Sequence, residues 1–193
     1  PVFTIATLVT LALGIGANTA IFSVINGVLL KPLPYKDPDR LVGLWQTAPG
    51  VNIENLNASI ADYVTYRDES KTLADVALWH GEGVTVTGVG EPERVQGIAA
   101  TSRLLPMLDV RPVLGRSFVV KDDDPGSPDV VMLGYGYWQR RFGGDPAVIG
   151  RRITADGSPR EIIGVLPQDF WFLDESYDVL LPLRFDRASV RLA

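Results

Sequence analysis

The chain has 193 residues, a net charge of −5 at pH 7 and no cysteine. A mildly acidic chain has no electrostatic attraction for phosphate backbones, which argues against nucleic-acid binding. Without cysteine the fold depends neither on disulfides nor on thiolate–metal sites. The first residue is Pro1 rather than methionine and Ala193 follows no recognisable end signal, so we expect a fragment of a longer protein.

A transmembrane helix is predicted for residues 1–30. No charged side chain occurs between Val2 and Leu30, and about 20 apolar residues suffice to cross a bilayer as a helix. The run is also longer than the apolar core of a secretory signal, which has about 7–15 residues. Three prolines between Lys31 and Arg40 end the helix, because proline lacks the N–H donor and forces extended backbone. Residues 31–40 are interpreted as a linker to a domain at 41–193, which we expect to be incomplete at its C-terminus.

Small residues form a stripe on this helix. Ala12, Gly16 and Ala20 recur every four residues, a spacing that lets a neighbouring transmembrane helix approach closely. Asn18 and Asn26 are expected to hydrogen-bond across this contact, because an unpaired amide is costly in hydrocarbon. The alternative is that these residues merely face lipid.

The region after the linker alternates strand and helix patterns. Its first part predicts a strand at 41–47, a polar loop at 48–58 and a helix from Ser59, where Asp62 completes a capping box. Apolar alternation predicts three further strands with glycines at their turns, namely 76–79, 84–87 and 94–98 with Gly81, Gly83, Gly88 and Gly90.

The second part predicts a short helix at 102–108 broken at Pro106, a loop at 111–116, a strand at 130–133 and a helix at 135–142 ended by Gly143 and Gly144. Strands at 149–155 and 160–165 flank Asp156-Gly157, a dipeptide typical of a type I′ hairpin turn. We expect buried aromatic anchors at Tyr137, Trp138, Phe142, Trp45 and Trp79. Several short strands with a few helices indicate an α+β fold.

No catalytic, cofactor-binding or metal-binding residue is predicted. Residues 14–20 match G-x-G-x-x-A, but a dinucleotide site needs a preceding strand, and these glycines lie inside the apolar run. His80 is the only histidine, and no G-x-S-x-G or P-loop motif occurs. Residues 122–124 are three successive aspartates; we interpret them as a solvated acidic turn, with a divalent-cation site as the alternative.

Five separated segments together resemble a known family. They are residues 10–23 with 29–35 and 38–41, Gly90–Val95, Val110–Arg116, Trp138–Pro146 and Ile162–Pro167. In this order they are similar to the first membrane helix and the MacB-like periplasmic core domain of MacB/FtsX-type ABC transporter permeases, and most of all to the large duplicated permeases called ADOP.

The resemblance implies a permease subunit of the inner membrane whose residues after 31 are extracytoplasmic. It implies an ABC-type ATPase as a separate subunit or domain, a permease dimer or pseudo-dimer, a periplasmic adaptor as a further partner, and no enzymatic role or cofactor for this chain. The outer domain would couple ATP-driven helix motion to export or to the periplasmic partner. Two alternatives stay open, a single-span anchored hydrolase with paired carboxylates and an extracytoplasmic sensor domain. The transported substrate does not follow from the sequence.

Overall fold

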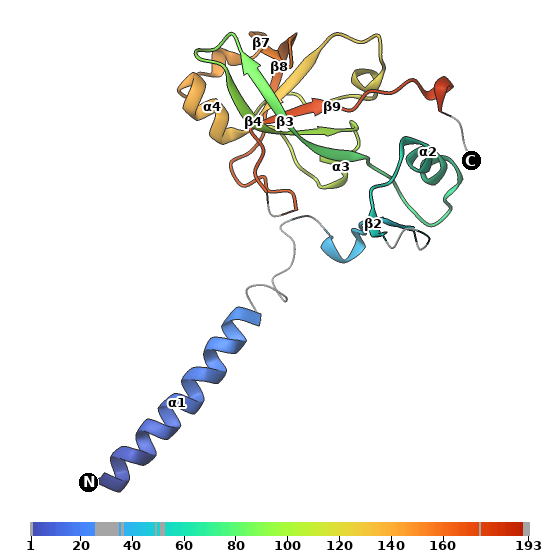
Figure 1. The fold of residues 1–193 in the computed structure, drawn as a ribbon. Coiled ribbons are helices and arrows are strands. Elements are labelled where there is room, and N and C mark those ends of the chain that lie inside the picture. The colour runs from blue at the N-terminus through green and yellow to red at the C-terminus, as the bar shows by residue number, and fades with distance from the viewer. Residues whose placement is uncertain are drawn as a thin grey trace. The chain divides into compact units, whose positions relative to one another are not determined.

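The computed structural model describes residues 2–25, 35, 37–48, 50, 53–173 and 175–190. The chain divides into two compact units, Pro1–Arg40 and Leu41–Ala193. A long helix dominates the first unit, and a sheet with surrounding helices forms the second (Figure 1).

The helix of the first unit is α1 (Val2–Ile25). Its segment Val2–Ser23 is long and apolar enough to cross a membrane, and none of it is buried within the protein. The hydroxyls of Thr7 and Thr10 donate hydrogen bonds to carbonyls one turn earlier in the helix, so these polar groups are satisfied internally. At about 1.5 Å per residue the helix exceeds the roughly 30 Å of a bilayer core. Residues 26–34, which include Asn26 and the expected helix end, lie outside the described residues.

A seven-stranded sheet forms the centre of the second unit (Figure 1). Its strands are β3 (Trp79–Thr87), β4 (Glu93–Ala100), β5 (Leu114–Gly115), β6 (Val130–Leu133), β7 (Arg152–Ala155), β8 (Ser158–Val165) and β9 (Val179–Pro182). Their order is β5-β8-β6-β9-β4-β3-β7, and β7 also pairs with β8. The sheet closes on itself because β8 changes partners, pairing with β7 at one end and with β6 at the other. Closure leaves little unpaired strand edge.

The turn between β7 and β8 is the predicted type I′ hairpin. Asp156 and Gly157 both have positive φ, 48° and 77°, as this turn requires. The turn is also fastened to β3, since the backbone N–H of Asp156 donates to the carbonyl of Thr85 at 2.9 Å. In return the Asp156 carboxylate accepts a hydrogen bond from the Thr85 N–H at 2.8 Å. A local sequence signal therefore also fixes a long-range contact.

Several strand boundaries differ from the predictions. Instead of a strand at 41–47 and a loop at 48–58, the structure has a two-stranded antiparallel sheet of β1 (Gln46–Ala48) and β2 (Ile53–Leu56). Gly81 and Gly83 do not form turns but lie within β3, where Gly83 leaves room for the side chain of Arg94. The predicted loop at 111–116 contains β5, and β9 was not predicted at all. The strands β5 and β9 were missed because their partners, β8 and β4, are distant in sequence.

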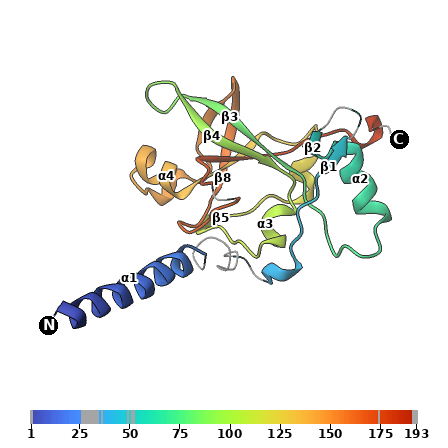
Figure 2. The ribbon, with the colours of Figure 1, turned by 60° about the horizontal axis from the view of Figure 1, so that its bottom comes forward.

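In the described part of the second unit, three α-helices lie around the sheet. In α2 (Ile60–Glu69) the predicted capping box is confirmed, with Asp62 N–H donating to Ser59 Oγ and Ser59 N–H donating to the Asp62 carboxylate. Pro106 does not break the predicted helix but lies inside α3 (Leu104–Met107), because a proline in the first turn costs no helical hydrogen bond. Helix α4 (Tyr135–Phe142) ends as predicted, at Gly143 with φ of 62°. Figures 1 and 2 show α4 and α2 on opposite sides of the sheet.

The core occupies both faces of the sheet. Along β4, β6 and β9 successive side chains are buried, so alternate residues point into two separate apolar layers. Tyr137, Trp138 and Phe142 of α4 are buried in one layer, as predicted. Of the other expected anchors, Trp79 is half-buried against Phe172, but Trp45 is 52% exposed and is not an anchor. The prediction for Trp45 was wrong, because this side chain precedes β1 and lies at the protein surface.

Candidate functional site

His80 and the acidic turn are the titratable positions that the sequence analysis singled out. His80 lies exposed on β3, with its Nε2 3.5 Å from the carboxylate of Glu82. Within the described part of the chain, no group of three or more His, Cys, Asp or Glu residues could hold a metal ion.

The acidic turn is a structural clamp rather than a solvated turn. Asp122 is 5% exposed and accepts hydrogen bonds from the Arg116 guanidinium at 2.7 Å and from the Val119 N–H at 2.8 Å. Burial raises the pKa of Asp122, but these hydrogen bonds outweigh it and leave the pKa below its ordinary value. Our interpretation as a solvated turn holds only for Asp124, which is exposed.

Asp123 is the second clamped carboxylate. It accepts hydrogen bonds from the backbone N–H of Ser102 at 3.0 Å and from the Ser102 hydroxyl at 2.8 Å. Burial is the largest influence on the Asp123 carboxyl and raises its pKa, although the Ser102 hydrogen bonds oppose the change. Asp123 thus connects the 119–124 turn to the segment that precedes α3.

Glu93 holds α4 against the sheet. Its carboxylate on β4 accepts a hydrogen bond from Nε of Arg141, which lies on α4. This hydrogen bond is the main reason that the pKa of Glu93 lies below its ordinary value. Burial, with the neighbouring Glu93 carboxylate, raises the pKa of Tyr137 to about 12. The three residues have the geometry of a packed ion pair and not of an acid–base pair facing a cavity.

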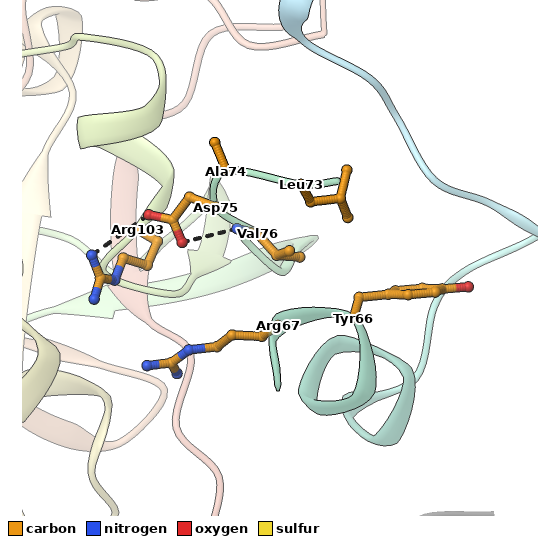
Figure 3. A pocket seen from close by; sticks show the side chains of 7 residues that line it. All are labelled: Tyr66, Arg67, Leu73, Ala74, Asp75, Val76 and Arg103. Atoms are coloured by element: carbon orange, nitrogen blue, oxygen red, sulfur yellow. Dashed lines mark hydrogen bonds and ion pairs between the residues drawn. The ribbon is translucent and has the colours of Figure 1, made fainter. Parts of the chain in front are cut away.

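A half-open pocket of about 240 Å³ lies beside α2. It is lined by Tyr66, Arg67, Leu73, Ala74, Asp75, Val76 and Arg103. Figure 3 shows the guanidinium groups of Arg67 and Arg103 on the same side of the pocket, with the Tyr66 ring pointing away from them. Asp75 pairs with Arg103 at 3.5 Å and accepts a hydrogen bond from the Val76 N–H at 2.9 Å. The lining contains no serine, cysteine or histidine, so its groups suit a polar contact rather than nucleophilic catalysis.

Residues 185–187 of the second unit contact α2. The ring of Tyr63 on α2 contacts the ring of Phe185 edge to face, with centroids 5.8 Å apart. Arg187, at the start of the 3₁₀ helix η6 (Arg187–Ser189), forms an ion pair with Asp68 of α2. Figures 1 and 2 both show this C-terminal helix beside α2. We call α2 together with residues 184–190 the terminal joint.

Arg184 attaches the terminal joint to the rest of the domain. Its guanidinium donates to the Asp122 carbonyl at 3.0 Å, to the Asp129 carboxylate at 2.7 Å and to the Pro128 carbonyl. The joint is thereby connected to the turn that Asp122 and Asp123 hold in place. The sequence analysis missed Arg184, Phe185 and Arg187, because their partners are distant in sequence and no local motif marks them.

Four of the predicted helix-packing residues, Ala12, Gly16, Asn18 and Ala20, lie on α1, whereas Asn26 lies outside the described residues. Ala12, Gly16 and Ala20 are exposed, and a side chain at Gly16 would meet only open space. At about 100° per residue these three lie on one face of the helix, whereas Asn18, two residues from Gly16, points to another face. The small residues and Asn18 therefore do not belong to a single contact surface, and helix packing at the small residues stays a prediction.

The comparisons with known proteins agree with this architecture. A family profile of the MacB-like periplasmic core domain matches residues 4–192. The periplasmic region of MacB from Actinobacillus actinomycetemcomitans has a similar fold, with a TM-score of 0.56 and 14% identity over 72% of this chain and 62% of that one. The extracellular domain of the ABC-type transporter YknZ from Gram-positive bacteria gives a TM-score of 0.50 and 18% identity, over 64% of this chain and 60% of that one.

At these identities the structural likeness shows the fold alone, and the chain spans about three fifths of either solved domain. No curated protein matches the chain by sequence. The apolar helix α1 and a periplasmic-type domain fit an inner-membrane protein with an extracytoplasmic domain. The profile match covers nearly the whole sequence, and the chain belongs to the family of the MacB-like periplasmic core domain, found in ABC transporter permeases.

Proposed function

We propose that this chain is the membrane anchor and outer domain of an ABC transporter permease, in which the domain transmits ATP-driven motion. Residues 1–30 cross the inner membrane, residues 31–40 form the linker, and residues 41–193 lie outside the cytoplasm. The family membership and the apolar helix α1 support this assignment. ATP is hydrolysed on a separate ABC-type subunit or domain, so this chain needs no catalytic side chain.

The terminal joint is the observation that carries the mechanical role. Tyr63 and Phe185 bring the first helix of the domain and its C-terminal segment into direct contact. Arg184 then connects this contact to the closed sheet through Asp122 and Asp129. A displacement applied at α2 or at residues 184–190 is therefore passed to a close-packed body, which moves as a unit because its interior resists deformation.

The partners follow from the same proposal. A second permease copy, or the other half of a duplicated permease, contacts the helix face of Ala12, Gly16 and Ala20, where small residues permit close backbone approach. The outer domain acts on the exported substrate or on a periplasmic adaptor. The chemical nature of the substrate is not part of the proposal.

Surface labelling tests the orientation. The chain has no cysteine, so Gly126→Cys introduces a single thiol at an exposed position where a side chain meets open space. We expect an impermeant maleimide to label this thiol in intact spheroplasts. Ala17→Cys, within the expected span, is the matched control and should be labelled only after detergent is added. Protection of the Gly126→Cys thiol until lysis would place the domain in the cytoplasm and contradict the proposal.

A further inference from the structure

The half-open pocket beside α2 brings two arginines together. Arg67 lies in the last turn of α2, and Arg103 directly precedes α3. Both line the pocket, and Figure 3 shows their guanidinium groups on the same side of it. Because like charges repel, a cavity that gathers two guanidinium groups favours a bound anion. We call this cavity the α2 pocket.

The described residues do not saturate either guanidinium group with hydrogen bonds. A guanidinium has five N–H donors. Nη1 of Arg103 lies 3.5 Å from the Asp75 carboxylate, which is longer than the roughly 2.7–2.9 Å of a charged hydrogen bond. The buried Nε of Arg103 has no hydrogen-bond partner among the described residues. The contact of Arg67 Nη1 with the Tyr63 hydroxyl is also 3.5 Å long. Both side chains therefore have donors for a further acceptor.

The charge of the lining matches a single negative charge. The two arginines contribute +2, Asp75 contributes −1 and the other four lining residues are neutral, which leaves +1. Asp68, next to Arg67 in sequence, does not line the pocket and pairs with Arg187. A carboxylate therefore neutralises the α2 pocket. A phosphate monoester, which carries about −1.5 to −2 at pH 7, would leave excess negative charge.

The size and polarity of the α2 pocket limit the rest of the ligand. Its volume of about 240 Å³ lies below the roughly 300–1,000 Å³ of pockets for drug-sized ligands. Polar atoms form most of the surface that faces the cavity. A small polar organic acid fits these properties, with its carboxylate at the guanidinium groups, where arginine binds carboxylates through two parallel hydrogen bonds.

We propose that the α2 pocket binds the carboxylate of a small organic acid through the guanidinium groups of Arg67 and Arg103. The binding requires only the folded outer domain. The transport role proposed above does not depend on it, so a failure of binding would leave that role intact.

Ligand-observed NMR tests the site in the full-length chain, held in nanodiscs of phosphatidylcholine, a lipid without net charge. The probe is lactate, and lactamide, its neutral amide, is the matched ligand. We expect saturable saturation-transfer signals from lactate and none from lactamide. Equal binding of the two would overturn the role of the arginine charges. Tighter binding of inorganic phosphate than of lactate would overturn the assignment to a carboxylate.

Variants locate the binding in the α2 pocket. Arg67→Gln and Arg103→Gln should each raise the dissociation constant of lactate about tenfold, as expected for the loss of a charged hydrogen bond. Lys71→Gln is the matched control, because Lys71 is exposed but does not line the pocket, and it should leave the constant unchanged. Asp75→Asn removes the competing carboxylate and should lower the constant.

The result for Arg67→Gln is decisive. Arg67 is exposed on α2, so its substitution should leave the melting temperature of the domain unchanged even if Arg103→Gln lowers it. A dissociation constant for lactate that is equal in wild type and Arg67→Gln would overturn the inference.

Discussion

The rings of Tyr63 and Phe185 meet edge to face with centroids 5.8 Å apart, although the two residues lie far apart in the sequence. Tyr63 is 2% exposed, so the contact is part of the packed domain. The Arg187–Asp68 ion pair lies beside it. As a result, α2 and residues 184–190 cannot move independently without separating an aromatic contact.

Close backbone approach makes Gly134 intolerant of any side chain. Its N–H donates to the Asp178 carbonyl at 2.8 Å, and a Cβ atom would collide with the carbonyl oxygen of Tyr177. We expect Gly134→Ala to destabilise the domain by about 1–3 kcal/mol or more, as overpacking does in rigid interiors. Gly126→Ala, where the methyl meets open space, should change stability by less than about 0.5 kcal/mol. Urea unfolding of the two variants checks the difference, and equal midpoints would contradict the Gly134 contact.

Asp123 should matter for folding, whereas its neighbour Asp124 should not. Asp123→Ala leaves the part-buried N–H and hydroxyl of Ser102 without their acceptor. The expected loss is about 1–3 kcal/mol in the free energy of unfolding, the usual cost of an unsatisfied polar group. Asp124→Ala, at an exposed position, serves as the matched control. If both variants unfold at the same urea concentration, Asp123 has no clamping role.

The Glu93–Arg141 pair predicts a pH dependence. The hydrogen bond from Arg141 sets the pKa of Glu93 below its ordinary value of 4.5, so the unfolded chain takes up this proton at a higher pH than the folded domain. The stabilisation is therefore complete above pH 4.5 and is lost as the pH falls through the pKa of the folded domain. Glu93→Gln should lower stability at pH 7 and show a shallower decline below pH 4.5. Glu69→Gln, at an exposed position on α2, is the control for removing one negative charge. If the stability of Glu93→Gln and of the wild type declined equally steeply below pH 4.5, the prediction would be refuted.

Helix association should depend on Gly16. Gly16→Leu places a bulky side chain on the face of Ala12 and Ala20 and should weaken association of reconstituted chains, measured by energy transfer between labelled copies. Gly14→Leu adds the same side chain about 200° around the helix and should have little effect. The outer domain should unfold at the same temperature in both variants. Equal association would show that the small residues face lipid.

Local signals in the sequence were sufficient to predict features whose interacting residues are close together in the chain. The Ser59–Asp62 capping box, the Asp156-Gly157 turn and the glycine end of α4 each involve residues within one turn of one another, and all three were predicted. The aromatic side chains of α4 were placed correctly because their spacing matches one buried helix face.

Long-range pairing could not be predicted in this way. Closure of the sheet depends on β8 joining β7 and β6, and β9 pairs in parallel with β4, about eighty residues earlier. Trp45 was expected to be buried because it is large and apolar, but its burial depends on what covers it. Likewise, residues 122–124 were interpreted as a solvated turn because the sequence does not show that Arg116 and Ser102 lie beside them.

The central claim, that ATP-driven motion moves the outer domain as one body, is tested most directly by distances between spin labels in the complete permease with its ATPase. One pair, Glu69→Cys with Ala188→Cys, reports on the terminal joint; a second pair, Val2→Cys with Gly126→Cys, joins α1 to the outer domain. We predict that trapping ATP shifts the distance distribution of the second pair and leaves that of the first unchanged. The account would be contradicted if the distance distribution of the second pair did not change when ATP is trapped. It would also be contradicted if the distance between the labels of the first pair increased on ATP binding.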